Sequence, residues 1–232
     1  MPTIYTSPAR LRFHELAAAL LLAAASAVLA APPLSPALQG VLDLAVLDYE
    51  SGRIDSARLA FDKLARSGMP AAQFNLAVMH LRGEMPKPDL AEAERLLKRA
   101  ADGGFVTAQF MLGQALETGQ LGKRDLAQAL RWYELAAVNG SVEAQVELAT
   151  AYYLGRGKPK DASQAVRWYR EAAKSGDVGA QYLLASLYEQ GDGVERDLRL
   201  ARYWYDIAAK NGDDAAPGKL IEVDAKLTAK PA

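Results

Sequence analysis

The sequence predicts an all-α protein built as a solenoid of stacked antiparallel helix pairs. Its 232 residues are 50% hydrophobic, which is enough apolar material for an extended core. Alanine and leucine dominate while β-branched residues are sparse, and this favours helix because neither residue loses much rotamer freedom there. The pair Ala-Gln also recurs at a constant spacing, as in helical repeat proteins. It occurs every 36 residues, at Ala72-Gln73, Ala108-Gln109, Ala144-Gln145 and Ala180-Gln181.

The start of the chain has the pattern of a secretory signal. Arg10 and Arg12 precede an apolar run from Leu16 to Ala30, which closes with small residues at the −3 and −1 positions. A membrane anchor is the alternative, but the run is shorter than the roughly 20 residues that a spanning helix needs. We predict a cleavable signal peptide over residues 1–30, a proline-rich linker over 31–37, and export to the periplasm or beyond.

Residues 38–70 are predicted to form a shorter helical hairpin that caps the N-terminal end. Gly52 to Gly68 spans 16 residues, whereas Gly83 to Gly104 in the first regular repeat spans 21. The inner loop of the hairpin is therefore shorter than that of the repeats.

Regular repeats follow, and each is predicted to form two helices. Apolar residues recur three and four positions apart in both halves of a repeat, as within Ala108 to Leu116 and Leu126 to Ala137. Glycines stand just past these runs, where positive φ commonly ends a helix. After the last repeat, the leucine column continues into a solitary helix that would cover the hydrophobic edge. The predicted segments are 71–107, 108–143, 144–179 and 180–214 for the repeats and 215–228 for the capping helix.

An aspartate precedes the second helix of each repeat. Asp125 with Gln128, and Asp161 with Gln164, have the spacing of capping boxes, in which the carboxylate accepts hydrogen bonds from backbone amides. A calcium loop over residues 191–197 is the alternative, but this run lacks alternating oxygen ligands and a closing glutamate. We interpret the aspartates as structural.

A Trp-Tyr pair recurs in the second helix of three repeats, at 132–133, 168–169 and 204–205. A repeated position usually means a repeated packing role, so these aromatics are interpreted as mostly core. Stacking of a ligand on the tryptophans is the alternative.

Composition limits the chemistry that the chain can perform. A formal charge of −1 offers no basic excess for nucleic acid. Cysteine is absent, which excludes disulfides and thiolate metal sites. The only histidines are His14, inside the predicted signal, and His80, so a histidine-based triad or zinc cluster would need two or more further partners. Ser-Lys chemistry or a carboxylate pair is the alternative, but the acidic residues fall at helix caps and exposed positions, where solvated charge is the ordinary explanation. We predict no catalytic residue, no metal and no cofactor.

Several motifs resemble the Sel-one-like repeat family, a relative of the tetratricopeptide repeat. They are Ala-x-x-x-Leu-(Gly/Ala)-x-x-Tyr, Gly-x-Gly-Val-x-x-Asp, Ala-x-x-Trp-Tyr and Ala-Ala-x-x-Gly, and they are most complete from Ala180 to Gly212. The repeat from Ala72 departs from the pattern, with Leu96-Leu97 in place of Trp-Tyr. The resemblance covers roughly residues 38–228, and the hairpin at 38–70 is similar to a plain tetratricopeptide unit. It implies a right-handed α-solenoid whose first helices line a concave groove.

A candidate groove follows from the columns of the first helices. In the second repeat Leu112 is expected to face the paired helix, so Phe110, Gln114 and Glu117 lie on the opposite side. Aromatic anchors with polar neighbours would suit a peptide or helix from a partner. The residues Phe74, Phe110, Val146 and Tyr182 form a stripe of equivalent positions along the groove. The alternative is tight packing between neighbouring first helices, which would bury this stripe. The candidate residues are Phe74, Val78, Arg82, Phe110, Gln114, Glu117, Val146, Thr150, Tyr153, Tyr182, Ser186 and Glu189.

The residues and the resemblance together predict a non-enzymatic scaffold or adaptor of the bacterial cell envelope, which binds a partner protein or peptide in this groove. The alternative is a cell-wall-associated glycan binder or hydrolase, which carboxyl groups with raised pKa values in a cleft would favour. We expect no nucleic-acid partner and no stable membrane insertion after signal cleavage. We also expect a monomer or a weak oligomer.

Overall fold

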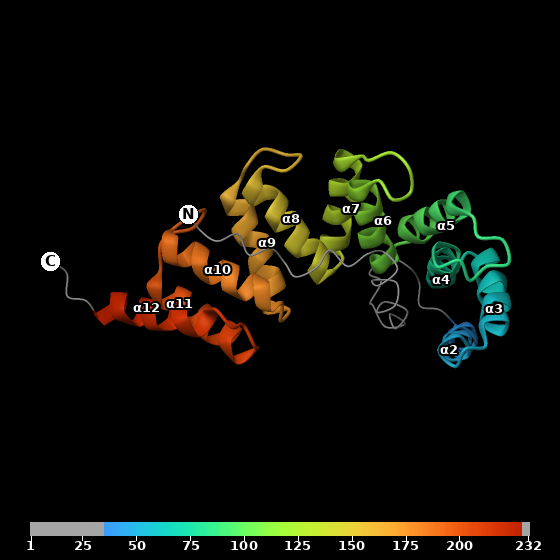
Figure 1. Ribbon diagram of the computed structural model, residues 1–232, viewed down its shortest axis with the longest axis horizontal. Coiled ribbons are helices and arrows are strands. Elements are labelled where there is room, and N and C mark those ends of the chain that lie inside the picture. Colours follow the sequence, from blue (N-terminus) through green and yellow to red (C-terminus); the bar gives the residue numbers. More distant parts are fainter. Residues whose placement is uncertain (1–34, 229–232) are drawn as a thin grey trace. The chain divides into compact units, whose positions relative to one another are not determined.

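The computed structural model describes residues 35–228, and its secondary structure in this range is entirely helical (Figure 1). Eleven helices and no strand occur among these residues, which confirms the all-α prediction. None of the described helices is both long and apolar enough to span a bilayer. The predicted signal at 1–30 and most of the linker lie outside the described residues.

The described residues fall into two compact units, 35–141 and 142–228. The first unit contains α2 (Pro36–Glu50), α3 (Ile54–Arg66), α4 (Pro70–Leu81), α5 (Leu90–Asp102), α6 (Val106–Thr118) and α7 (Leu126–Val138). The second contains α8 (Val142–Leu154), α9 (Ala162–Lys174), α10 (Val178–Gln190), α11 (Leu198–Lys210) and α12 (Ala216–Thr228).

Both units are stacks of helix pairs. In the first unit α2 packs on α3, α4 on α5 and α6 on α7, while α3 also contacts α4 and α5 contacts α6. In the second unit α8 packs on α9 and α10 on α11, while α9 contacts α10 and α12 covers α11. Each of the first helices α4, α6 and α10 is therefore contacted by its own second helix and by the preceding one.

The predicted aspartates cap the second helices. Asp125 Oδ1 accepts from the backbone N–H of Gln128 at 2.9 Å, and Asp161 accepts from that of Gln164 at 3.0 Å. Asp89 and Asp197 perform the same role for α5 and α11. These bonds satisfy amides that have no partner inside the helix.

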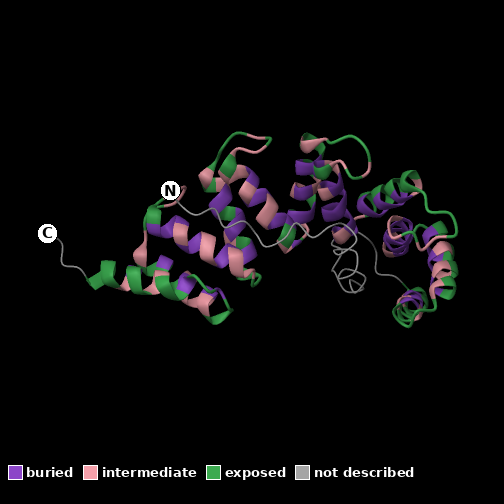
Figure 2. Ribbon diagram, viewed as in Figure 1, coloured by how far each residue is buried: buried purple, intermediate pink, exposed green. Residues whose placement is uncertain are grey.

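The core of the helix pairs contains both small and large side chains. The alanine column at Ala93, Ala129, Ala165 and Ala201 is fully buried and lets the helices approach closely. Tyr133, Tyr169 and Tyr205 are buried as predicted, and Trp168 is buried as well. The remaining two tryptophans, Trp132 and Trp204, are only partly buried. Figure 2 shows the buried residues along the facing sides of the helices.

The glutamine of the Ala-Gln pair bridges neighbouring helices in two repeats, at Gln109 and Gln181. Gln109 Nε2 donates to the carbonyl of Ala101 in the preceding second helix at 3.2 Å, and Gln181 donates to that of Ala173 at 3.1 Å. Their Oε1 atoms accept from Asn139 and Asn211, each at 3.0 Å, at the end of their own second helices. One buried amide thus joins three helices, which accounts for its constant position in the repeat.

Candidate protein-binding surface

The predicted groove residues Phe74, Val78 and Phe110 are buried in the unit at 35–141. Phe74 is 1% exposed and Val78 is fully buried on α4, while Phe110 on α6 is 7% exposed. The Phe74 ring lies 5.1 Å from that of Phe105, and the Phe110 ring lies 5.7 Å from that of Tyr133. The prediction of an exposed groove is therefore wrong for these three residues. Second helices contact both α4 and α6 from two sides and bury these residues, whereas the alternative had expected neighbouring first helices to bury them.

Glu117 is another correction. The helical wheel placed it away from the paired helix, but its carboxylate accepts a hydrogen bond of 2.9 Å from the hydroxyl of Tyr133 on α7. The Tyr133 ring lies close to Gly113 of α6, where an added Cβ would come within 2.7 Å of it, and its hydroxyl reaches Glu117. Gln114, one turn earlier, is half-buried.

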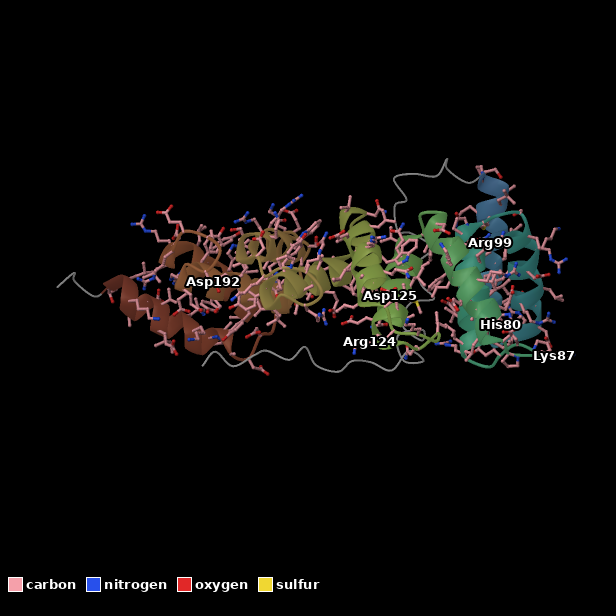
Figure 3. All side chains as sticks on the ribbon, turned by 90° about the horizontal axis from the view of Figure 1, so that it is seen from above. His80, Lys87, Arg99, Arg124, Asp125 and Asp192 are labelled. Carbon is pink, nitrogen blue, oxygen red and sulfur yellow. The ribbon has the colours of Figure 1, made fainter. Side chains whose placement is uncertain are left out.

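Arg82 and the single described histidine serve the fold of the same unit. Arg82 Nη1 donates to the hydroxyl oxygen of Tyr49 at 2.5 Å, and Tyr49 donates to Glu84 at 2.7 Å. Burial raises the pKa of Tyr49, and its bond to Glu84 adds to this shift. The Nδ1 atom of His80, labelled in Figure 3, accepts from the backbone N–H of Asp89 at 3.1 Å. His80 therefore closes the loop before α5.

Candidate groove residues at the equivalent repeat positions are partly exposed in the unit at 142–228. Val146, Thr150 and Tyr153 on α8 and Tyr182 and Ser186 on α10 are half-buried. We call these five residues the first-helix surface. They combine one aliphatic and two aromatic side chains with hydroxyl groups, which suits contact with a peptide.

Neighbouring side chains hold two residues of the first-helix surface in place. The Tyr182 ring packs edge-on against Tyr205, with 5.2 Å between the centroids. The Thr150 hydroxyl lies 2.9 Å from that of Tyr169. Burial raises the pKa of Tyr169 to about 12, so this hydroxyl stays protonated and available for hydrogen bonding. The surface is thus supported from the second helices.

Charged groups border the first-helix surface. The repeat positions from which the groove was predicted did not include them. Arg156 Nη2 lies 2.8 Å from Glu147 Oε2. Burial raises the pKa of Tyr153, and the negative charge of Asp192 and a hydrogen bond to it act in the same direction. Asp192 belongs to the loop after α10 (Figure 3). Glu147 directly follows Val146 in the sequence, and this adjacency to a candidate groove residue could have predicted its position.

Glu189 is buried beneath this surface and is not part of it. Its carboxylate accepts from Tyr205 at 2.9 Å and from Lys226 of α12 at 2.5 Å. Burial alone would raise the pKa of Glu189. The hydrogen bonds from Lys226 and Tyr205 outweigh burial, together with the positive charge of Lys219, and they hold the pKa below its usual value. The residue joins α10, α11 and α12.

Three carboxyl groups among the described residues have shifted pKa values. The shifts resolved for carboxyl pKa values, those of Asp48, Asp125 and Glu189, are all downward. Hydrogen bonds from Ser56 and Arg53 lower the pKa of Asp48, and those from Gln128 lower the pKa of Asp125. No group of three His, Asp or Glu residues that could hold a metal ion occurs within 35–228.

Stacked helix pairs with capped second helices and a bridging glutamine define an α-helical repeat protein of the solenoid class. The family model for the Sel1 repeat matches residues 70–105, 106–141, 142–177 and 178–213, and the chain belongs to this family. Sel1 repeat proteins are generally non-catalytic and generally act as protein-protein interaction scaffolds.

Two solved structures illustrate the similarity. A Sel1 repeat protein from Oxalobacter formigenes is 30% identical, with a TM-score of 0.69, and the match covers 84% of this chain and 83% of that one. A protective antigen of uropathogenic Escherichia coli with an SLR fold, c5321, is 33% identical, with a TM-score of 0.66 over 73% of this chain. This match spans 36% of the antigen's length. Comparison with curated protein sequences gave no match.

Proposed function

We propose that this protein is a non-enzymatic scaffold that holds a partner peptide or helix on the first-helix surface. The observation that supports this proposal is a difference in side-chain exposure between equivalent positions of the repeats. Phe74 and Phe110 are buried, whereas Val146 and Tyr182 at the same repeat positions keep part of their surface open. Rigid tyrosines lose little entropy on binding and often anchor interfaces. Adjacent hydroxyl groups would orient the bound backbone.

The proposal includes a place of action. The apolar run before Ala30, with arginines ahead of it, supports export by a cleavable signal peptide, and hence a role in the bacterial cell envelope. Mass spectrometry of the protein recovered from the native envelope tests this part, because cleavage after Ala30 would leave Ala31 as the first residue. Recovery of the chain with residues 1–30 attached would reject it.

The hydrolase alternative has less support. General acid catalysis at neutral pH needs a carboxyl group whose pKa is raised toward the working pH. The carboxyl pKa shifts resolved here are downward. We therefore propose binding without catalysis, through a protein partner and without a cofactor or metal.

Site-specific photocrosslinking tests the binding surface. A photoreactive phenylalanine analogue would replace Ser186 on the first-helix surface or, as a matched control, the exposed Leu200 of α11. We expect one defined protein to be crosslinked from position 186 and not from 200. The substitution Val146→Glu should abolish this crosslink, because it places a charge in the apolar part of the surface.

Circular dichroism must first show that all these variants fold alike. Equal crosslinking from both positions, or a crosslink that survives Val146→Glu, would contradict the proposal. Crosslinking to glycan alone would favour the alternative.

A further inference from the structure

Helix α2 exposes an apolar face. Leu44 is 64% exposed and Leu47 is 52% exposed, and Leu38 and Val41 are also exposed. The buried residues of α2 are Leu42, Ala45 and Tyr49, and Leu44 and Leu47 point away from them, while α2 packs on α3. Terminal helices of repeat stacks normally present polar side chains to water. The exposed face of α2 thus differs from that of an ordinary terminal cap.

Backbone hydrogen bonds at the helix ends identify the residues of α4 that are equivalent to the exposed apolar residues of α2. After α2, Gly52 N donates to Tyr49 O and Arg53 N to Asp48 O; after α4, Gly83 N donates to His80 O and Glu84 N to Met79 O. The two helix ends therefore superpose with a shift of 31 residues. In this register Leu38, Val41, Leu44 and Leu47 correspond to Met69, Ala72, Asn75 and Val78, which are all buried.

The cause of this difference is the preceding helix. Helix α4 has α3 packed against it, and Gln73 of α4 bonds the carbonyl of Ala65 in α3 at 3.2 Å. Among residues 35–228 no helix precedes α2. Helix α2 is therefore built like an internal first helix whose preceding second helix is missing from the described part of the chain.

We propose that α2 is a docking surface for an amphipathic, basic-flanked helix of another protein, which takes the position of the missing second helix. Helix α2 contains three acidic residues and no basic one: Asp43, Asp48 and Glu50. Arg53 neutralises Asp48 through contacts of 2.7 and 2.9 Å. Asp43 and Glu50 lie four and three residues from Leu47, so they border the apolar face and would attract lysine or arginine on the partner.

Other occupants fit this surface less well. A second copy docked through α2 would bring Asp43 and Glu50 of both copies together, and like charges repel. The apolar run Leu16–Ala30 of the same chain carries no charge on any side. It would cover α2 only by exposing its own outer face to water, whereas α3 and α5 carry charged outer faces.

Binding of a synthetic helix tests the proposal. The probe is a stapled, fluorescein-labelled peptide with leucine and alanine at helical spacing and lysines on the flanks, and a second peptide replaces the lysines by glutamate. Fluorescence anisotropy would measure binding to the full-length protein and to Leu44→Glu. Leu90→Glu is the matched control, because Leu90 on α5 is 60% exposed. Both substitutions lie on exposed positions, and thermal melting would verify that both variants fold.

We expect the lysine peptide to bind the wild type and Leu90→Glu alike, and to bind Leu44→Glu at least about tenfold more weakly. The glutamate peptide should bind the wild type more weakly than the lysine peptide. Equal binding of the lysine peptide to all variants would overturn the proposal. Binding only after removal of residues 1–30 would assign the surface to the chain's own segment, and a wild-type dimer that Leu44→Glu dissociates would assign it to a second copy. Neither result bears on the first-helix surface.

Discussion

The hydroxyl of Tyr205 donates a hydrogen bond of 2.9 Å to the buried carboxylate of Glu189. Tyr133 and Glu117 form the same bond with the same length, and each pair is separated by 16 residues. In the repeat between them Tyr169 bonds Thr150 instead. The second-helix tyrosine is therefore bonded to its first helix in three repeats, although its partner changes.

Removing the hydroxyl of Tyr205 should destabilise the protein. The substitution Tyr205→Phe keeps the ring against Tyr182 but deletes one hydrogen bond to a buried carboxylate, and such bonds contribute about 1.5–3 kcal/mol. Urea unfolding would measure the loss. Tyr203→Phe is the control, because Tyr203 is exposed and should change stability by less than about 0.5 kcal/mol. Equal stability of the two variants would contradict this role of the hydroxyl.

Lowering the pH should reduce the contribution of Glu189 to the free energy of unfolding. Its pKa is held below the usual value in the folded protein, so the unfolded chain binds more protons at pH values between the folded pKa and about 4.3. The free energy of unfolding therefore falls as the pH drops through this window, and the contribution of Glu189 is complete above it. Glu189→Gln should remove this dependence.

Denaturant unfolding between pH 6 and pH 3 would measure the effect. The stability difference between the wild type and Glu189→Gln should shrink toward low pH. Glu222→Gln is the control, because Glu222 is an exposed residue whose pair with Lys219 contributes little. Parallel curves for the wild type and Glu189→Gln would mean that the carboxylate is not stabilised by its partners.

Much of the fold could be predicted from repetition. The 36-residue spacing identifies the helix pairs, because a position that recurs in each repeat has the same packing role. Asp125 and Asp161 could be assigned as caps because capping depends on local spacing alone. The buried tyrosines follow from the same reasoning.

The binding surface was less predictable because exposure depends on neighbours in space. A helical wheel gives the direction of Phe110 relative to Leu112, but it does not reveal that second helices cover α6 from two sides. It also does not show how far Tyr133 reaches toward Glu117. The bridging role of Gln181 was missed for the same reason, since its partners Ala173 and Asn211 lie 8 and 30 residues away.

The glutamine bridge provides a third prediction. Gln181→Ala should cost about 2 kcal/mol or more, because it leaves the buried carbonyl of Ala173 and the amide of Asn211 without this partner. A double-mutant cycle with Asn211→Ala should give a coupling energy of about 0.5–3 kcal/mol. Gln190→Ala, on the exposed end of α10, is the control and should be near neutral. Additive effects of Gln181→Ala and Asn211→Ala would show that the amides do not act together.

Alanine substitutions at two glycines that both have positive φ should reduce the stability of the protein by different amounts. Gly193 and Gly212 have φ values of +73° and +97°, so either substitution places alanine in the left-handed region at about 1–2 kcal/mol. A Cβ on Gly193 would also overlap the backbone of Ala162 at the start of α9, whereas a Cβ on Gly212 would meet nothing within 4 Å. Overpacking of this kind adds about 1–3 kcal/mol. We therefore expect Gly193→Ala to lower the free energy of unfolding clearly more than Gly212→Ala in urea titrations. An equal loss would mean that the loop after α10 is not seated on α9, and that Gly193 is required only for its backbone conformation.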